Sequence, residues 1–80
     1  MVWWVVESFF VAEGEYLLVL RGGSLKMISR VLSTHPVYPG DILTPVRDAR
    51  YIINANKQQM LKAIEATAFT EKEWYMLSLQ

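Results

Sequence analysis

The 80-residue sequence contains no cysteine and only one histidine, His35. The lack of thiols excludes disulfides and cysteine-based zinc sites. A metal site or a hydrolytic triad would depend on His35 alone, and no serine lies in the glycine-flanked elbow typical of serine hydrolases. The sequence therefore predicts no metal site, no cofactor and no catalytic residues, and we expect a protein that is not an enzyme.

An excess of charge of one sign is also missing, because eight basic residues balance eight acidic ones. No strong global field therefore attracts nucleic acid or anionic membranes. The distribution is uneven: residues 16–62 contain seven bases and two acids, whereas the two ends are acidic. One side of the molecule is basic if the ends pack together, and a chance asymmetry on a solvated surface is the alternative.

No hydrophobic run approaches the ~20 residues of a membrane-spanning helix. The apolar residues 1–12 have no basic start and no small-residue cleavage site, and Glu7 interrupts them, unlike a secretory signal. We therefore expect a cytoplasmic protein without membrane contact. The length predicts a single domain over residues 1–80.

What the sequence has in plenty is apolar residues, 52% of the chain, including ten aromatics. Short segments rich in Val, Ile, Trp, Phe and Tyr alternate with turn residues, as is typical of strands. Pro39-Gly40 and Gly22-Gly23 suit tight turns. The pattern predicts a mainly β protein, a small antiparallel barrel or roll of six to seven short strands. The clearest strands are expected at residues 2–12, 16–20, 42–46 and 50–53.

Residues 24–34 fit either a strand or a helix. A helical face behind a Ser24 cap is compatible with the apolar spacing, whereas the β-branched Ile28 and Val31 after a Gly-Gly turn favour a strand. If the domain contains one short helix, residues 24–34 are the most favoured position for it.

The C-terminal quarter also allows two interpretations. Residues 58–68 contain strong helix formers, and Thr70 with Glu73 matches a capping box. The alternation in residues 73–79 instead favours a strand. We predict a β-hairpin that turns at residues 70–73.

Residues 2–6 and 16–20 are apolar on both faces of their expected strands, which normally means that both faces are covered. A barrel this small has one interior, so we expect the outer face to meet a second subunit or a protein partner. Alternation sends Trp3 and Trp4 to opposite faces, one into the core and one outward. The leading hypothesis is a non-enzymatic binding or assembly module that self-associates. Its expected contact residues are Trp3, Trp4, Phe9 and Phe10.

The alternative hypothesis is a small barrel that binds nucleic acid, because bases can stack on aromatic side chains beside a basic groove. The zero net charge makes this the less favoured interpretation. Its expected binding residues are Arg30, Arg47, Arg50, Tyr51 and Lys57.

Three short motifs occur in an order that resembles the β-core of bacterial type I signal peptidases: Arg30-Val31, Pro39-Gly40-Asp41 and the segment 51–54. In that family a catalytic lysine directly precedes the Arg-Val pair, and here that position is Ser29. The resemblance therefore implies no peptidase activity for this chain.

Overall fold

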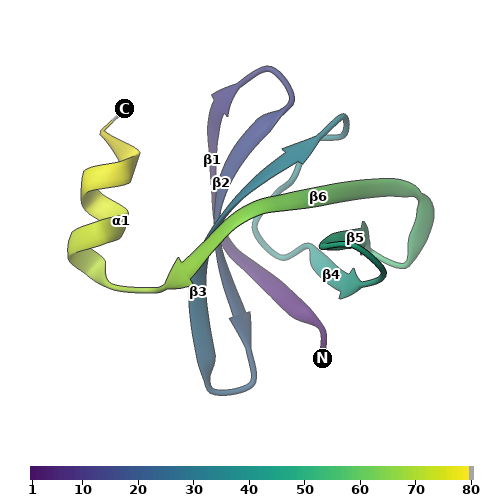
Figure 1. The fold of residues 1–80 in the computed structure, drawn as a ribbon, viewed down its shortest axis with the longest axis horizontal. Coiled ribbons are helices and arrows are strands. Elements are labelled where there is room, and N and C mark those ends of the chain that lie inside the picture. Colours follow the sequence, from purple (N-terminus) through teal and green to yellow (C-terminus); the bar gives the residue numbers. More distant parts are fainter. Residues whose placement is uncertain (80) are drawn as a thin grey trace.

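The computed structural model describes residues 1–79 and contains six strands and one helix in that range. All pairings are antiparallel, and the strands close a barrel in the order β1-β2-β3-β6-β5-β4 (Figure 1). The elements are β1 Trp3–Ala12, β2 Glu15–Gly22, β3 Leu25–Ser33, β4 Ile42–Pro45, β5 Arg50–Ile53, β6 Asn56–Ala68 and α1 Glu71–Ser78. The predicted small antiparallel barrel is confirmed.

Side chains that alternate along the strands fill the barrel. In β2, Leu18 and Leu20 point inward and are almost completely buried. Trp3 and Tyr51 pack against this core from its periphery. The buried core consists of Val5, Leu18, Leu20, Val31, Val37, Leu43, Ile53 and Leu61.

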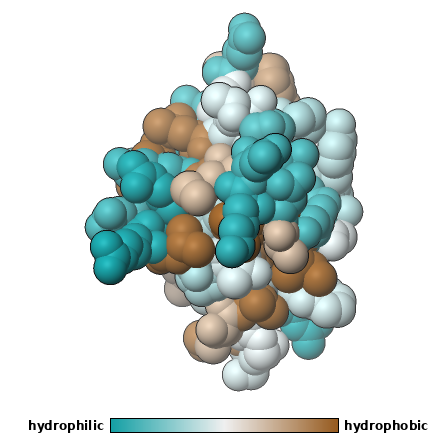
Figure 2. Space-filling model, turned by 90° about the vertical axis from the view of Figure 1, so that its right-hand side faces the viewer, coloured by the Kyte–Doolittle hydropathy of each residue, from teal (hydrophilic) through white to brown (hydrophobic). Residues whose placement is uncertain are grey.

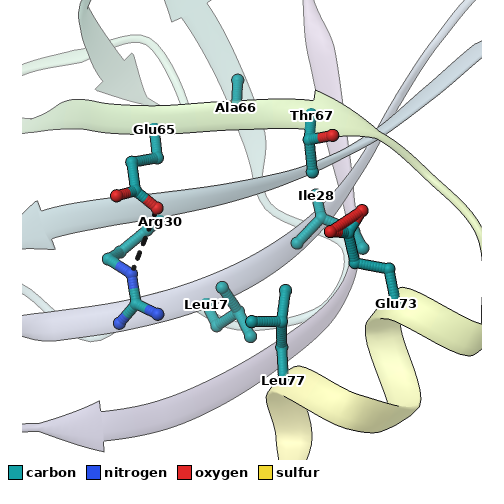
Figure 3. A pocket seen from close by; sticks show the side chains of 8 residues that line it. All are labelled: Leu17, Ile28, Arg30, Glu65, Ala66, Thr67, Glu73 and Leu77. Carbon is teal, nitrogen blue, oxygen red and sulfur yellow. Dashed lines mark ion pairs between the residues drawn. The ribbon is translucent and has the colours of Figure 1, made fainter.

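A second set of apolar residues is buried on the outside of the barrel. Leu17 and Val19 alternate with the inward-pointing residues of β2, and Val19 pairs with Ile28 of β3. All three are nevertheless buried. Leu17 and Ile28 line one wall of a groove whose other wall is α1, through Leu77 (Figure 3). The helix therefore lies over the outer face of β2 and β3, and the chain itself covers the second apolar face predicted for residues 16–20.

The strand favoured for residues 24–34 is confirmed, and the alternative of a helix at this position is wrong. These residues contain β3, which pairs with β2 on one side and with β6 on the other. The hairpin predicted to turn at residues 70–73 is also wrong, because Thr70 caps α1 by accepting a hydrogen bond from the amide of Glu73 at 3.1 Å. The residues expected to form the second strand of this hairpin instead form α1, which packs on the outer face of the barrel through Leu77.

The helix and the shortest strands lie on opposite sides of the molecule: α1 is beside the barrel on one side, and β4 and β5 form the other (Figure 1). On the side away from α1, hydrophobic residues appear as separate patches among hydrophilic ones (Figure 2). Within residues 1–79, no helix has the length and apolarity needed to cross a bilayer.

Candidate protein-binding surface

The two N-terminal tryptophans occupy opposite faces of β1, as alternation predicts. Trp3 packs against the core cluster. Trp4 points outward, and 58% of it is exposed. The structure therefore assigns the core role to Trp3 and the outward position to Trp4.

Trp4 lies in the middle of a row of residues that crosses the outer face of the barrel. Its direct partners are Ile42 in β4 and Arg21 in β2. Direct partners in antiparallel strands place their side chains on the same face. A shallow hollow beside Trp4 is lined by Val2, Arg21 and Gly23. An aromatic ring and a cation therefore border one depression.

The row continues into β3, where Lys26 is the direct partner of Arg21. The Lys26 ammonium lies 4.2 Å from the centroid of the Phe69 ring, a cation–π contact that holds this end of the row. Among residues 1–79, neither Arg21 nor Lys26 forms an ion pair. We call the row Ile42, Trp4, Arg21 and Lys26 the Trp4 strip.

The other two residues expected at a self-association surface lie near the opposite end of β1. Phe9 is half-buried, and Phe10 is 60% exposed. The Phe10 ring packs edge-on against Tyr16, with ring centroids 5.8 Å apart. Trp4 and Phe10 therefore do not form one continuous patch, because most of β1 separates them.

The residues expected to bind nucleic acid are dispersed. Arg30 forms ion pairs with Glu15 and Glu65, so its charge is compensated and only 19% of its side chain is exposed. Tyr51 packs against the core instead of offering a stacking platform. Lys57 lies at the start of β6, beside the β5–β6 turn. A basic face with an aromatic platform is not assembled from this set.

Two of these residues do come together. Arg47 lies in the turn between β4 and β5, and Arg50 is the first residue of β5. The Arg50 amide donates to the Arg47 carbonyl at 3.1 Å. Arg50 is also the direct cross-strand partner of Lys62 in β6. Sequence analysis did not select Lys62, because only the register of β5 against β6 shows that it faces Arg50.

The residues that metal or acid–base chemistry would use have structural partners in the described part of the chain. No group of three His, Cys, Asp or Glu side chains is placed to hold a metal ion there. The Nδ1 atom of His35 lies 3.2 Å from the Thr34 hydroxyl, and the Asp41 carboxylate accepts from the Tyr38 amide and from Asn54. These groups hold the chain between β3 and β5 in place.

The model of the IraM/PmrD family matches residues 1–75. The chain is 43% identical to the signal transduction protein PmrD of Salmonella typhimurium strain LT2 over 81 residues, which covers 98% of the chain and 95% of that protein. It is 40% identical to the protein of the same name from Escherichia coli K12 over 64 residues, covering 78% of the chain and 73% of that protein.

Two solved structures share the fold. The crystal structure of E. coli PmrD matches with a TM-score of 0.92 and 32% identity, covering 99% of this chain and 96% of that one. The solution structure of PmrD from Klebsiella pneumoniae matches with a TM-score of 0.82 and 36% identity, covering 95% and 96%. Both matches cover nearly the whole chain, and both are structures of PmrD. The signal peptidase family, by contrast, resembles the chain only in three short motifs.

Proposed function

Because the chain belongs to the IraM/PmrD family, we propose that it is a signal transduction protein that acts by binding a partner protein through the Trp4 strip. The names of the relatives support a role in signalling. The observation that carries the choice of surface is the exposure of Trp4, 58%, between Ile42 and Arg21.

The exposed indole of Trp4 gains free energy when a partner removes it from water. Tryptophan and arginine are the residues most enriched at positions that dominate binding energy in protein interfaces. An apolar centre with charged groups at its rim is the usual arrangement of such interfaces. Trp4 and Ile42 form the apolar centre, and Arg21 and Lys26 form a positively charged rim. The strip therefore suits a partner with an acidic surface, because complementary charge speeds association and selects the partner.

Self-association through the same residues is the second candidate function, and Trp4 is again the residue that favours it. A twofold dimer would apply the Trp4 strip of one copy to the strip of another. In that arrangement Arg21 and Lys26 add like charges to both sides of the contact, which opposes binding. In addition, α1 of the same chain covers Leu17 and Ile28. Part of the apolar surface for which a second subunit was expected is therefore already covered within one chain. A different protein is therefore the favoured partner.

The test compares variants of the strip in cells. The affinity-tagged chain carrying Trp4→Ala or Arg21→Glu is crosslinked, purified and compared with the unmodified chain by quantitative mass spectrometry. The matched controls are Met76→Ala, an exposed apolar residue on α1, and Lys57→Glu, a basic residue outside the strip. We expect both strip variants to lose the same protein at least tenfold and both controls to retain it.

Light scattering of the purified chain distinguishes the two candidates. A monomer near 9.3 kDa at tens of micromolar, together with loss of one protein from the strip variants, supports the proposal. A dimer that Trp4→Ala dissociates supports self-association instead. If the strip variants and the controls retain the same proteins, the Trp4 strip is not the binding surface.

A further inference from the structure

We propose that the turn between β4 and β5, together with Lys62, forms a binding site for an acidic protein segment. In this site a carboxylate of the segment lies between Arg50 and Lys62, with Arg47 beside it. The site consists of residues outside the Trp4 strip and does not depend on it. We call Arg47, Arg50 and Lys62 the basic turn site.

The first observation is a pair of like charges. Arg50 and Lys62 are direct partners in the antiparallel β5–β6 ladder, so both side chains project from the same face of the barrel. Like charges directly opposite each other destabilise a sheet. Within residues 1–79 neither Lys62 nor Arg47 forms an ion pair, and Arg50 has only a loose one with Asp48, at 3.9 Å. A bound carboxylate between the two cations removes this repulsion.

The second observation is that the turn is both strained and fixed. Asp48 and Ala49 have φ angles of 58° and 59°, the pattern of a type I′ hairpin turn, which aspartate tolerates but in which alanine is strained. Three backbone hydrogen bonds hold the turn in place: from the Val46 amide to the Arg50 carbonyl (2.9 Å), from Arg50 to Arg47 (3.1 Å), and from Ala63 of β6 to Ala49 (2.8 Å). Because strained residues concentrate where a ligand needs a fixed geometry, the turn fits a preorganised site.

The third observation concerns the surface beside the two cations. Arg50 and Lys62 line a hollow of about 360 Å³ that also includes Leu32 and Met60. Leu32 is 44% exposed and Met60 is 40% exposed, so both can contact a bound chain. A free anion gains nothing from an apolar wall, whereas a peptide with an apolar side chain next to an acid contacts both parts. Among the described residues, no aromatic side chain lines this hollow, so it offers no platform on which a nucleic-acid base could stack.

The experiment is an NMR titration of the full-length ¹⁵N-labelled chain, following backbone amides and arginine Nε–H groups. The probe is an acetylated and amidated hexapeptide of sequence Asp-Leu-Glu-Asp-Leu-Glu. A second peptide with Asn and Gln in place of the acids tests the need for charge, and inorganic phosphate tests whether a free oxyanion is sufficient. We expect the acidic peptide to shift the signals of Arg50, Lys62 and Leu32 and to bind more weakly as salt is raised.

Two variants and two controls locate the site. Arg50→Gln and Lys62→Gln should each weaken peptide binding at least fivefold. Lys57→Gln, which removes a cation from the same strand outside the hollow, should leave it unchanged, and so should Trp4→Ala. Retained binding by Trp4→Ala keeps this test separate from that of the Trp4 strip.

Each remaining outcome contradicts the proposal. Equal binding of the neutral peptide would show that charge is not what the site recognises. Binding of phosphate without binding of the acidic peptide would identify a site for a free anion only. Equal losses from Lys57→Gln and Lys62→Gln would show a general electrostatic attraction instead of a defined site.

Discussion

The indole ring of Trp3 lies directly against Gly22 at the end of β2. A Cβ atom at position 22 would be 2.9 Å from Cε3 of Trp3 and equally close to the sulfur of Met1. Real carbon atoms do not approach each other so closely, so the absence of a side chain at Gly22 allows Trp3 to reach the core. The tight turn predicted at Gly22-Gly23 lies one residue later, since Gly22 ends β2 opposite Leu25 and Gly23 has the positive φ of 61°. Glycine at position 22 therefore makes room for Trp3, a role that the turn pattern does not reveal.

We expect Gly22→Ala to destabilise the barrel by roughly 1–3 kcal/mol, the usual cost of inserting a methyl group into a packed site. Urea denaturation measures it. In the double variant with Trp3→Leu the penalty should shrink, because the smaller side chain leaves room for the new methyl group. Equal penalties in the two backgrounds would show that the contact with Trp3 is not the cause.

Trp3 and Trp4 should respond differently to truncation. Trp3→Ala removes a large side chain packed on the core and should cost about 3 kcal/mol of unfolding free energy. Trp4→Ala removes an exposed side chain and should change stability by less than about 0.5 kcal/mol. Thermal melting of both variants checks this. If both lose stability equally, the opposite placement of the two side chains is wrong.

The sequence is sufficient to predict the barrel and most strand positions because β-branched and aromatic runs and Gly-containing turns act locally. It is insufficient for the C-terminal helix, since the cap at Thr70 and the alternation after it point to different structures. In the structure the cap prevails, and the helix that it starts packs through Leu77 above Leu17 and Ile28. That packing is a tertiary contact, which a local pattern does not show. The same holds for the basic turn site, because Arg50 and Lys62 are distant in sequence and only the strand register brings them together.

The contact between α1 and the barrel gives a third prediction. Leu77 lines the groove above Leu17 and Ile28, whereas Met76, its neighbour, is 58% exposed. Leu77→Ala should therefore cost about 1–2 kcal/mol, and Met76→Ala less than about 0.5 kcal/mol. Hydrogen exchange should also show faster exchange of the α1 amides in Leu77→Ala than in Met76→Ala. Equal effects of the two variants would contradict the packing of α1 on this face.

The turn between β5 and β6 gives the last prediction. Asn54 and Ala55 have φ angles of 53° and 61°, the pattern of a type I′ turn. Asparagine tolerates this conformation, but alanine is strained in it by about 1–2 kcal/mol. Glycine relieves the strain at an entropic cost of roughly 0.5–1 kcal/mol. Ala55→Gly should therefore stabilise the protein by roughly 0.5–1 kcal/mol.

The control is Ala66→Gly, which places the same change within β6, where no left-handed angle is needed. It should destabilise the protein by roughly 0.5–1 kcal/mol, because only the entropic cost applies there. Urea midpoints with unchanged m-values give both numbers. Changes of the same sign in the two variants would show that the strain at Ala55 does not contribute to stability. Opposite signs would show that alanine at position 55 is less favourable than glycine. Ala49 has the same left-handed conformation in the hydrogen-bonded turn beside the basic turn site.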